Sequence, residues 1–490
     1  NPMTVSAKLN QTGAKYQNTA YQLDFGLIAE TETVSNSVPK TNPHKKNLNK
    51  AGVSINGKPV VAGTVNYYTL TADYSAYKGI EADANRIANG FHIVDDFPEE
   101  AVSVNENEIV VKDSKGNLVT GLKSTIYKTL ADAPKGVQES LKSAGYTPKG
   151  AIQVLTAENP TEFYNKYVKT GAVLTITNPM TVRKEMLGKV AEYKNTAYQL
   201  DFGLAMVTET VVNKVVKPNP KKANFDKVGV NIDGKQVFAG STNYYHVTMD
   251  YSKYKDIKSG SDAIQKGFGV VEDYPEEALD IERGEIRAFD SNGAEVKGIT
   301  EYHFNSIEEV KDPKIKAILE TSGIKPKGAF QVFMADNPQE FFDKYVSKGN
   351  SVTIVDPMRV KQSLDRKGAS YQNTAYQVDF GNGYQADIVE NRVPKTDPHK
   401  KNLNAKGVDI NGKQVLAGST NYYTLTADYS DYKGIEAEKD RVAKGFYFVD
   451  DYPEEAVDID TNGIKVVDSK GQAVKGYTSK VYKSVADAPK

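Results

Sequence analysis

The sequence contains no cysteine and no tryptophan. Without cysteine there can be no disulfide bond, thiol nucleophile or cysteine-ligated zinc site. No apolar run is long enough to span a membrane, so we expect no membrane insertion of this part of the protein. The first residues also lack the basic and apolar regions of a signal peptide. The 62 basic and 63 acidic residues nearly cancel, which argues against a nucleic-acid-binding protein.

A long internal repeat organises the sequence. The phrase YQNTAYQLDFG begins at Tyr16 and returns twice, slightly altered. Its asparagines, Asn18, Asn195 and Asn373, are separated by 177 and 178 positions. A period of this length is a domain rather than a turn of a solenoid. The sequence therefore predicts a tandem array of closely similar domains.

The frame of the repeat predicts two complete domains and two truncated ones. We expect the chain to be a fragment of a longer protein, with these parts: the closing strands of a preceding domain at 1–34, complete domains at 35–211 and 212–389, and a truncated domain at 390–490.

Within each repeat the pattern is mostly that of short strands. Pairs such as Asn56-Gly57 suggest β-hairpins with primed turns. Val137 and Leu141 share one face of a predicted helix that ends at Gly145. Many short strands with few helices favour a β-sandwich. The predicted fold class is mostly β, with short helical insertions.

The asparagine that opens the repeated phrase needs an explanation. The residues after it alternate as in a half-buried strand, with Tyr21, Leu23 and Phe25 on one face. Strict alternation places Asn18 on the opposite, more polar face. A bulge or bend near Thr19 would be needed to turn the asparagine inward, unless it lies at the edge of the sheet.

Two familiar kinds of site fit the sequence poorly. The run DDFPEE, which begins at Asp95, suggests the paired carboxylates of a glycoside hydrolase. Adjacent residues of a strand point to opposite faces, however, and an array of similar domains suits mechanical or multivalent work better. A carbohydrate-active enzyme stays the less favoured alternative.

Calcium is the second alternative. Residues Asp458 to Gly463 imitate the first half of an EF-hand loop, but Ser469 occupies the twelfth position, where glutamate is required. A β-turn explains these residues better. No cofactor is required, and calcium elsewhere in the acidic loops stays open.

A reaction between lysine and asparagine fits the repeats better than either. A neutral lysine amine can attack a carboxamide, release ammonia and leave an isopeptide bond. Burial favours the neutral amine by lowering its pKa, and burial keeps a nearby carboxylic acid protonated so that it can polarise the amide. Contact between the groups supplies most of the rate.

The repeats also select the lysine. Each repeat has a lysine two positions after an aligned proline, at Lys45, Lys222 and Lys400, whereas Lys46 aligns with Ala223 and is not shared. The interval from this lysine to the next repeated asparagine is 150 residues in the first case and 151 in the second. On these residues alone, a basic linker and an asparagine that merely opens a strand stay an alternative.

The phrases VPKTNPHKK, YYTLTADYSAYKG, GFHIVDDFPEEAV, GAIQVLTAENPTEFYNKYV and YKNTAYQLDFG resemble the C-terminal domains of the antigen I/II family of streptococcal surface adhesins. The similarity covers essentially the whole chain. It implies a variant immunoglobulin-like β-sandwich in each domain, closed by an autocatalytic Lys–Asn isopeptide bond. It also implies an extracellular protein, anchored to the bacterial cell wall, whose stalk domains bind host or bacterial surface glycoproteins and form a monomeric rod.

Carried over by motif, the resemblance implies bonds from Lys45 to Asn195 and from Lys222 to Asn373. The assisting acid in the family is the first of the VDD pair, which here is Asp95, Glu272 or Asp450. A rival acid occurs on a strand of each repeat, at Asp73, Asp250 and Asp428.

Asn18 and Lys400 are expected to have their partners outside the chain. Some family members use the segment that matches 137–150 for adherence between bacteria, although here it can equally be a packed helix and turn. The sequence therefore predicts a cross-linked adhesin stalk, with a purely structural spacer as the alternative.

Overall fold

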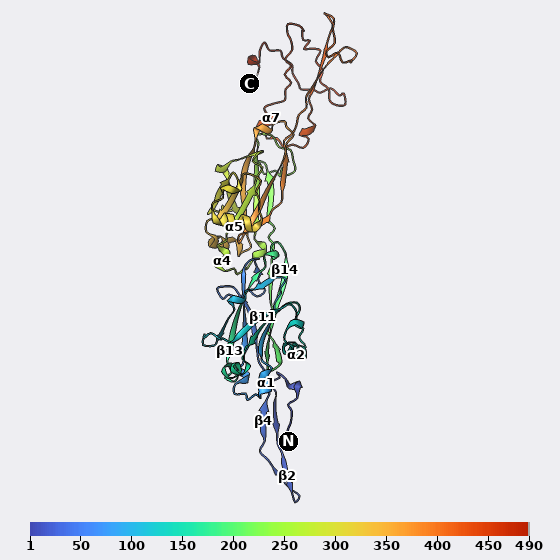
Figure 1. Cartoon of the computed structure of the whole chain (residues 1–490). Coiled ribbons are helices and arrows are strands. Elements are labelled where there is room, and N and C mark those ends of the chain that lie inside the picture. The colour runs from blue at the N-terminus through green and yellow to red at the C-terminus, as the bar shows by residue number, and fades with distance from the viewer. Residues whose placement is uncertain (489–490) are drawn as a thin grey trace. The chain divides into compact units, whose positions relative to one another are not determined.

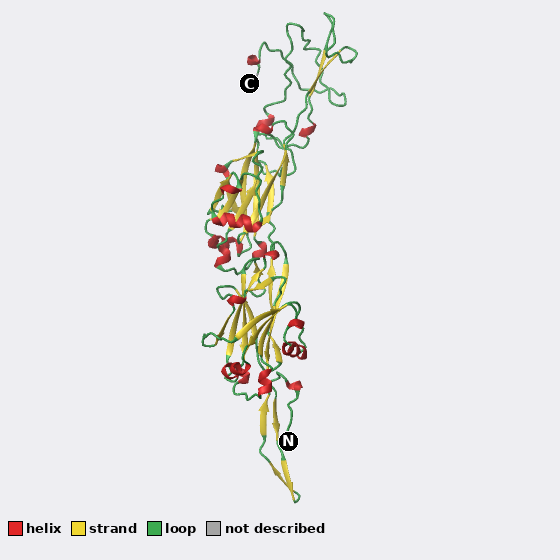
Figure 2. Cartoon of the chain, in the orientation of Figure 1, coloured by secondary structure: helices red, strands yellow, loops and turns green. Residues whose placement is uncertain are grey.

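The structure is a computed structural model that describes residues 1–488. The chain forms two compact units, the first spanning Asn1–Ile435 and the second beginning at Glu436. Strands predominate in the first unit, and its helices are short (Figure 2). Among the described residues, no helix combines the length and the hydrophobicity needed to cross a membrane.

Two β-sandwiches make up most of the first unit (Figure 1), and both have the mostly β, immunoglobulin-like architecture that was expected. Sandwich 1 denotes the elements from β5 to β16. Its first sheet contains β5 (His44–Leu48), β7 (Val65–Asp73), β9 (Val102–Val104), β10 (Val110–Asp113) and β13 (Val173–Val182). Its second sheet contains β6 (Pro59–Val60), β8 (Phe91–Asp96), β11 (Leu122–Tyr127), β12 (Ile152–Ala157), β14 (Ala191–Asp201), β15 (Leu204–Val207) and β16 (Val211–Val215).

The core of sandwich 1 lies between its two sheets. Strand β7 alternates strictly between buried and half-buried residues and pairs antiparallel with β13 over its whole length. Its inward residues, such as Leu70, pack against Ile93 of β8 and Ala197 of β14. Alternation with one buried face is what a sheet packed on another sheet requires.

The repeated phrase forms β14, and from Ala197 to Asp201 this strand is buried on both faces. Ala197 belongs to the core between the sheets, whereas Tyr198 and Leu200 pack under Leu141 of helix α2 (Lys135–Ser143). The face that looks more polar in the sequence is thus the one turned toward the opposite sheet. Asn195 lies on that face within an uninterrupted strand, so this copy needs no bulge to turn its asparagine inward. In the first copy, where the bend was predicted, the strand is interrupted between Asn18 and Tyr21.

Helix α2 ends just before Gly145, as predicted. Besides α2, sandwich 1 contains α1 (Ala84–Ala88) and α3 (Pro160–Phe163). The Asn159 side chain accepts a hydrogen bond from the Glu162 N–H, which caps α3. The predicted primed turn was wrong. Gly57 has φ 73°, but Asn56 is not among the described residues with positive φ, which is the pattern of a type II turn.

Sandwich 2 denotes the elements from β17 to β27 and repeats this topology. Its first sheet contains β17 (Lys221–Phe225), β18 (Thr242–Asp250), β20 (Leu279–Ile281), β21 (Arg287–Asp290) and β24 (Ser351–Val360). Its second sheet contains β19 (Phe268–Asp273), β22 (Ile299–Phe304), β23 (Phe330–Ala335), β25 (Ser370–Asp379), β26 (Asn382–Gln385) and β27 (Val389–Arg392).

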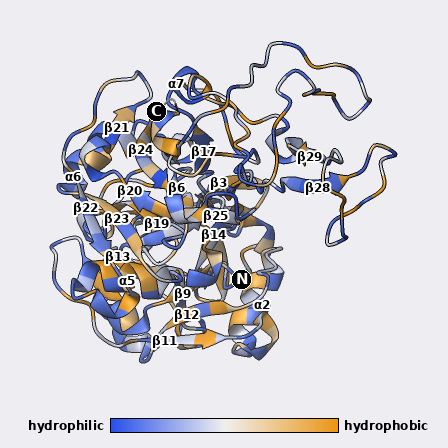
Figure 3. Ribbon diagram, turned by 90° about the horizontal axis from the view of Figure 1, so that it is seen from above, coloured by the Kyte–Doolittle hydropathy of each residue, from blue (hydrophilic) through white to orange (hydrophobic). Residues whose placement is uncertain are grey.

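The helices of sandwich 2 are α4 (Ser261–Ile264), α5 (Pro313–Ser322) and α6 (Pro338–Phe341). Helix α5 occupies the place of α2 and carries both hydrophobic and hydrophilic residues (Figure 3). Its Ile315 and Leu319 pack on Val378 of β25. Strand β25, the counterpart of β14, is therefore covered in the same way.

The remaining elements belong to the predicted truncated domains. The N-terminal ones are β1 (Lys15–Asn18), β2 (Tyr21–Asp24), β3 (Leu27–Glu30) and β4 (Val34–Ser37), all of which are exposed. After sandwich 2 follow β28 (His399–Leu403) and β29 (Tyr422–Thr426), and the second unit contains α7 (Lys439–Val442).

Candidate cross-linking sites

Strand β5 selects which of two adjacent lysines enters the core of sandwich 1. Lys45 and Asn47 are buried, whereas Lys46 between them is exposed. Neighbouring side chains of a strand point to opposite faces, so only one of the two lysines can face the second sheet. The lysine that the repeats select is the one that points inward.

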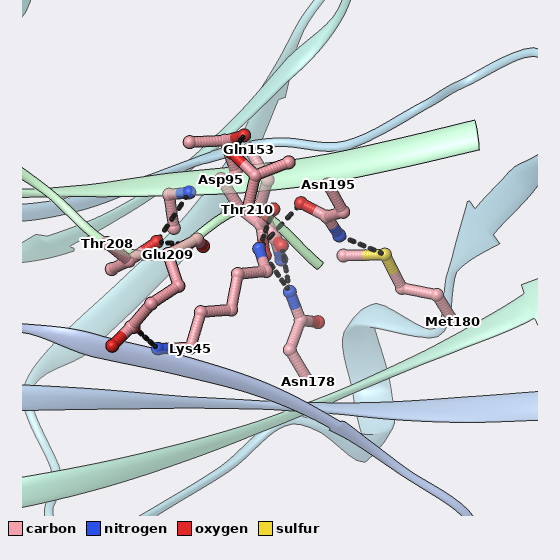
Figure 4. Close-up of polar contacts among 11 residues, drawn as sticks. Lys45, Asp95, Gln153, Asn178, Met180, Asn195, Thr208, Glu209 and Thr210 are labelled. Atoms are coloured by element: carbon pink, nitrogen blue, oxygen red, sulfur yellow. Dashed lines mark hydrogen bonds and ion pairs between the residues drawn. The ribbon is translucent and has the colours of Figure 1, made fainter. Parts of the chain in front are cut away.

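The Lys45 amine contacts both groups that the sequence predicts as its partners. Its Nζ donates to Asp95 Oδ1 at 2.7 Å and to Asn195 Oδ1 at 2.6 Å. Asp95 lies on β8 and Asn195 on the adjacent β14, and the lysine reaches them from the opposite sheet (Figure 4). The lysine and aspartate side chains are 0% exposed.

Burial changes the protonation of this site. Desolvation lowers the pKa of the Lys45 amine, although the neighbouring Asp95 carboxylate opposes the shift. The amine also lies 5.3 Å from the centre of the Tyr68 ring. Removing two opposite charges from water costs several kcal/mol per ion, at an order of magnitude. Burial therefore favours the neutral form of the Lys45 amine.

Two further amides surround the acid. Asn178 Nδ2 donates to Asp95 Oδ2 at 3.3 Å and to Gln153 Oε1 at 2.6 Å. The amide nitrogen of Asn195 faces the thioether of Met180, with Nδ2 3.7 Å from Sδ. A thioether is only a weak acceptor, so little holds this nitrogen in place. The carbonyl side of the Asn195 amide is thus engaged, and its nitrogen is loosely held.

Sandwich 2 contains a matching site with a longer acid. Lys222 Nζ contacts Glu272 Oε1 and donates to Asn373 Oδ1 at 2.8 Å. Lysine and glutamate are again 0% exposed. Burial lowers the pKa of Lys222 and raises the pKa of Glu272, the second shift being reduced by the lysine. The extra methylene of glutamate is accommodated.

The residues predicted as half-sites are more exposed than their counterparts in the two sandwiches. Asn18 is exposed on β1, with its amide nitrogen 3.8 Å from Met3 Sδ. Lys400 is exposed on β28, with Nζ 5.1 Å from the centre of the Tyr423 ring. Asp450 is half-buried in the second unit.

The rival acids are placed elsewhere. Each ends the strand or segment before a short 3-10 helix and accepts a hydrogen bond from the N–H two residues on, at 2.9 Å: Asp73 from Ser75, Asp250 from Ser252 and Asp428 from Ser430. This is the geometry of an Asx-turn, in which one carboxylate oxygen is engaged by the backbone. The geometry therefore favours Asp95 and Glu272 as the acids beside the lysines.

A second buried carboxyl closes the repeated strand, and sequence reasoning missed it. Asp201, at the end of β14, accepts a hydrogen bond from Gln199 Nε2 at 2.6 Å, and Asp379 accepts from Gln377 at 2.9 and 2.8 Å. Burial raises the pKa of Asp201 to about 7 and that of Asp379 to about 8. The aspartate of AYQLDFG, present in all three copies, was the available signal. The sequence pattern places it on the polar face of the strand, but in the structure its side chain points into the core.

No site for a metal ion can be assigned in residues 1–488. The structure places no three His, Cys, Asp or Glu side chains close enough to hold an ion in that range. In the EF-hand-like segment the Asp460 carboxylate accepts a hydrogen bond from the Asn462 N–H at 3.0 Å, which is the geometry of a turn. Calcium stays a prediction without assigned ligands.

Fold and site together define a tandem array of β-sandwich domains in which a buried lysine, acid and asparagine meet between the sheets. The chain belongs to the cell surface antigen I/II C2 terminal domain family. The family profile matches three times, at residues 43–215, 220–393 and 398–488.

Solved structures share the fold. The C-terminal domain of the Streptococcus pyogenes antigen I/II-family protein AspA is 20% identical, with a TM-score of 0.56, covering 72% of this chain and 99% of that one. The C-terminal domain of the Streptococcus agalactiae AgI/II polypeptide BspA is 23% identical, with a TM-score of 0.50, covering 72% and 100%.

A curated relative is the aggregation substance of Enterococcus faecalis (strain ATCC 700802 / V583). It is 29% identical over 251 residues, which are 51% of this chain. The match spans only 17% of the length of that relative.

The buried acid of sandwich 2 predicts a pH dependence of stability. Because folding raises the pKa of Asp379 to about 8, its contribution is fully present below the unfolded pKa of about 3.9 and is lost as pH rises through about 8. Asp379→Asn should flatten the decline in the free energy of unfolding of sandwich 2 across this range. Denaturant unfolding at several pH values measures it. The exposed Asp343→Asn is the control, and an unchanged slope in Asp379→Asn would contradict the prediction.

Proposed function

We propose that each complete sandwich is closed by an autocatalytic isopeptide bond, Lys45 to Asn195 in sandwich 1 and Lys222 to Asn373 in sandwich 2. The supporting observation is the contact of one buried amine with both an acid and an asparagine carboxamide, 2.7 and 2.6 Å away in sandwich 1. An ion pair by itself would need no asparagine. The same three groups recur in sandwich 2 although the acid differs.

The reaction needs only groups of the chain. The neutral amine of Lys45 attacks Cγ of Asn195 and forms a C–N bond, while the protonated Asp95 donates its hydrogen bond to the carbonyl oxygen on which negative charge develops. The carboxyl group then passes its proton to the amide nitrogen, and the resulting carboxylate takes a proton from the attached lysine nitrogen, which restores the acid. The C–N bond of the carboxamide breaks and ammonia leaves. Asp95 and Glu272 act as acids that return to their starting state.

Preorganisation lowers the activation barrier of this reaction. Groups held in contact avoid about 7–11 kcal/mol of the barrier that free reactants face, because folding has already fixed their relative positions. The amine comes from the first sheet and the carboxamide from the second, so the bond crosses the core. The site therefore forms when the domain folds, and the bond then stabilises the folded state.

We propose that the function of the cross-linked domains is to form the stalk of a cell-surface adhesin. A covalent link from β5 to β14 carries pulling force past the rest of the sandwich, and it is insensitive to redox potential in a chain without cysteine. Membership of a cell-surface family and similarity to an aggregation substance support this role. The domains 35–211 and 212–389 would be stalk units, outside the cell and anchored to its wall, with no substrate other than their own side chains.

Intact mass tests the cross-links directly. The purified chain should be lighter than its sequence mass by two ammonia molecules, one for each complete sandwich. Lys45→Ala should lose only one ammonia because its first site lacks the nucleophile. The exposed neighbour variant Lys46→Ala should still lose both. A wild-type mass equal to the sequence mass would contradict the proposal.

The cross-link should also stabilise sandwich 1. Asn195→Ala removes the electrophile but keeps the Lys45–Asp95 pair, so the variant loses chiefly the covalent loop. By the loop-entropy model for disulfides, a closed loop of about 150 residues contributes roughly 5 kcal/mol. Denaturant unfolding should show this loss in the transition of sandwich 1, with that of sandwich 2 unchanged. Equal stability of variant and wild type would argue against a bond.

Adhesion requires a separate test because a spacer would carry the same bonds. The partners that we propose are host or bacterial surface glycoproteins. Salivary or matrix glycoproteins, immobilised on a sensor surface, should bind the chain saturably, and deglycosylated samples serve as the control. Absence of binding to all of them would favour the structural spacer.

A further inference from the structure

The two sites differ at one buried position. Asn178 of sandwich 1 opens the phrase NPM, and the aligned phrase in sandwich 2 is DPM, which begins at Asp356. Each residue lies on the strand next to the lysine-facing tyrosine, Asn178 opposite Tyr68 and Asp356 opposite Tyr245. Both are 0% exposed. Sandwich 2 therefore buries a second carboxyl group beside its lysine and glutamate.

The exchange of asparagine for aspartate removes a donor. In sandwich 1 the Asn178 amide donates both to the acid and to Gln153. In the described part of sandwich 2, neither oxygen of Asp356 has a hydrogen-bond partner, and the same holds for Glu272 Oε2 and Gln331 Oε1. These are all acceptors in the ionised site. Buried acceptors without donors are costly, and a proton on Asp356 would provide the missing donor.

Charge balance leads to the same conclusion. In sandwich 1 one lysine faces one acid, so a single proton moves between them without creating net charge. In sandwich 2, Lys222 faces both Glu272 and Asp356. If Asp356 were ionised, the cluster would carry a net negative charge in the core, and this charge would hold the proton on Lys222.

We propose that Asp356 is a positioning residue that keeps a proton in folded sandwich 2, takes the place of the Asn178 donor and leaves Lys222 free to pass its own proton to Glu272. This inference rests on the proposed Lys222–Asn373 bond. The reaction is otherwise balanced as in sandwich 1. A C–N bond forms between Lys222 and Asn373, ammonia leaves, and Asp356 keeps its proton throughout.

The surroundings of Asp356 support this role. Burial, and then the carboxylate of Glu272 on β19, raise the pKa of Asp356 well above its usual value. Lys222 on β17 opposes the shift. Gln331 on β23 also lowers the pKa by its proximity, although its Nε2 donates to Glu301 Oε1 at 3.1 Å rather than to Asp356. Glu301 on β22 raises the pKa further. Acidic neighbours thus outnumber the one cation that faces Asp356.

The proposal predicts different pH profiles for the two bonds. The reactive state of sandwich 2 requires one proton more than that of sandwich 1. On the alkaline limb of the pH–rate profile, the rate of cross-linking in sandwich 2 should therefore begin to fall at a lower pH. Asp356→Asn removes the additional titration and should shift this limb upward. Asn178→Asp should shift the limb of sandwich 1 downward. A displacement of one pH unit corresponds to about a tenfold change in rate on that limb.

The experiment uses the full chain, recovered unfolded from inclusion bodies and shown by mass to be free of cross-links. It is refolded in buffers from mildly acidic to alkaline pH, quenched at intervals and digested. Mass spectrometry then follows the Lys45–Asn195 and Lys222–Asn373 peptides separately, so each sandwich is the internal control of the other. Asp356→Asn introduces the residue that sandwich 1 has at the aligned position, and Asn178→Asp provides an independent variant.

Opposite shifts of the two alkaline limbs would support the proposal. Cross-linking in both sandwiches, with profiles that neither variant moves, would overturn the role of Asp356 and leave the isopeptide bonds intact. Absence of both cross-linked peptides at every pH would overturn the proposed function itself, and the role of Asp356 with it.

Discussion

The contact of a buried lysine amine with a carboxyl group and a carboxamide is the interaction on which each sandwich depends. In sandwich 1 it joins β5 of one sheet to β8 and β14 of the other, in the centre of the core. A buried ion pair alone is weak support for a fold, because desolvation offsets the attraction. In the reaction that we propose, the asparagine changes this balance, because the lysine loses its charge and a costly contact becomes a covalent bond.

The remaining architecture serves to bury this contact. Strand β14 must present Asn195 to the opposite sheet and still hide Tyr198 and Leu200 on its other face. Helix α2 covers that other face, and α5 does the same for β25 in sandwich 2. The helical insertions therefore complete a second hydrophobic layer outside the sheet. Without them, a strand that is apolar on both faces could not stay at the surface of a sandwich.

The two sandwiches solve one electrostatic problem with different residues. Sandwich 1 pairs its lysine with Asp95 and an amide donor, Asn178. Sandwich 2 uses the longer Glu272 together with Asp356, whose oxygens have no hydrogen-bond donor among the described residues. In our proposal a proton on Asp356 replaces the amide donor, so that the two sites carry the same net charge although their side chains differ.

The sequence by itself determined the repeat and the β-sandwich class. It also predicted the pairing of Lys45 with Asn195, because almost the same interval between lysine and asparagine, 150 and 151 residues, occurs in both complete repeats. It could not show which face of the repeated strand is the core. Polar residues such as Asn195, Gln199 and Asp201 look solvent-facing in a pattern, yet all three are buried. Only the tertiary structure decided this, because burial depends on the opposing sheet and on α2. A local alternation of polar and apolar residues does not show where these elements lie. For the same reason Asp356 became visible only when Lys222 and Glu272 were seen beside it.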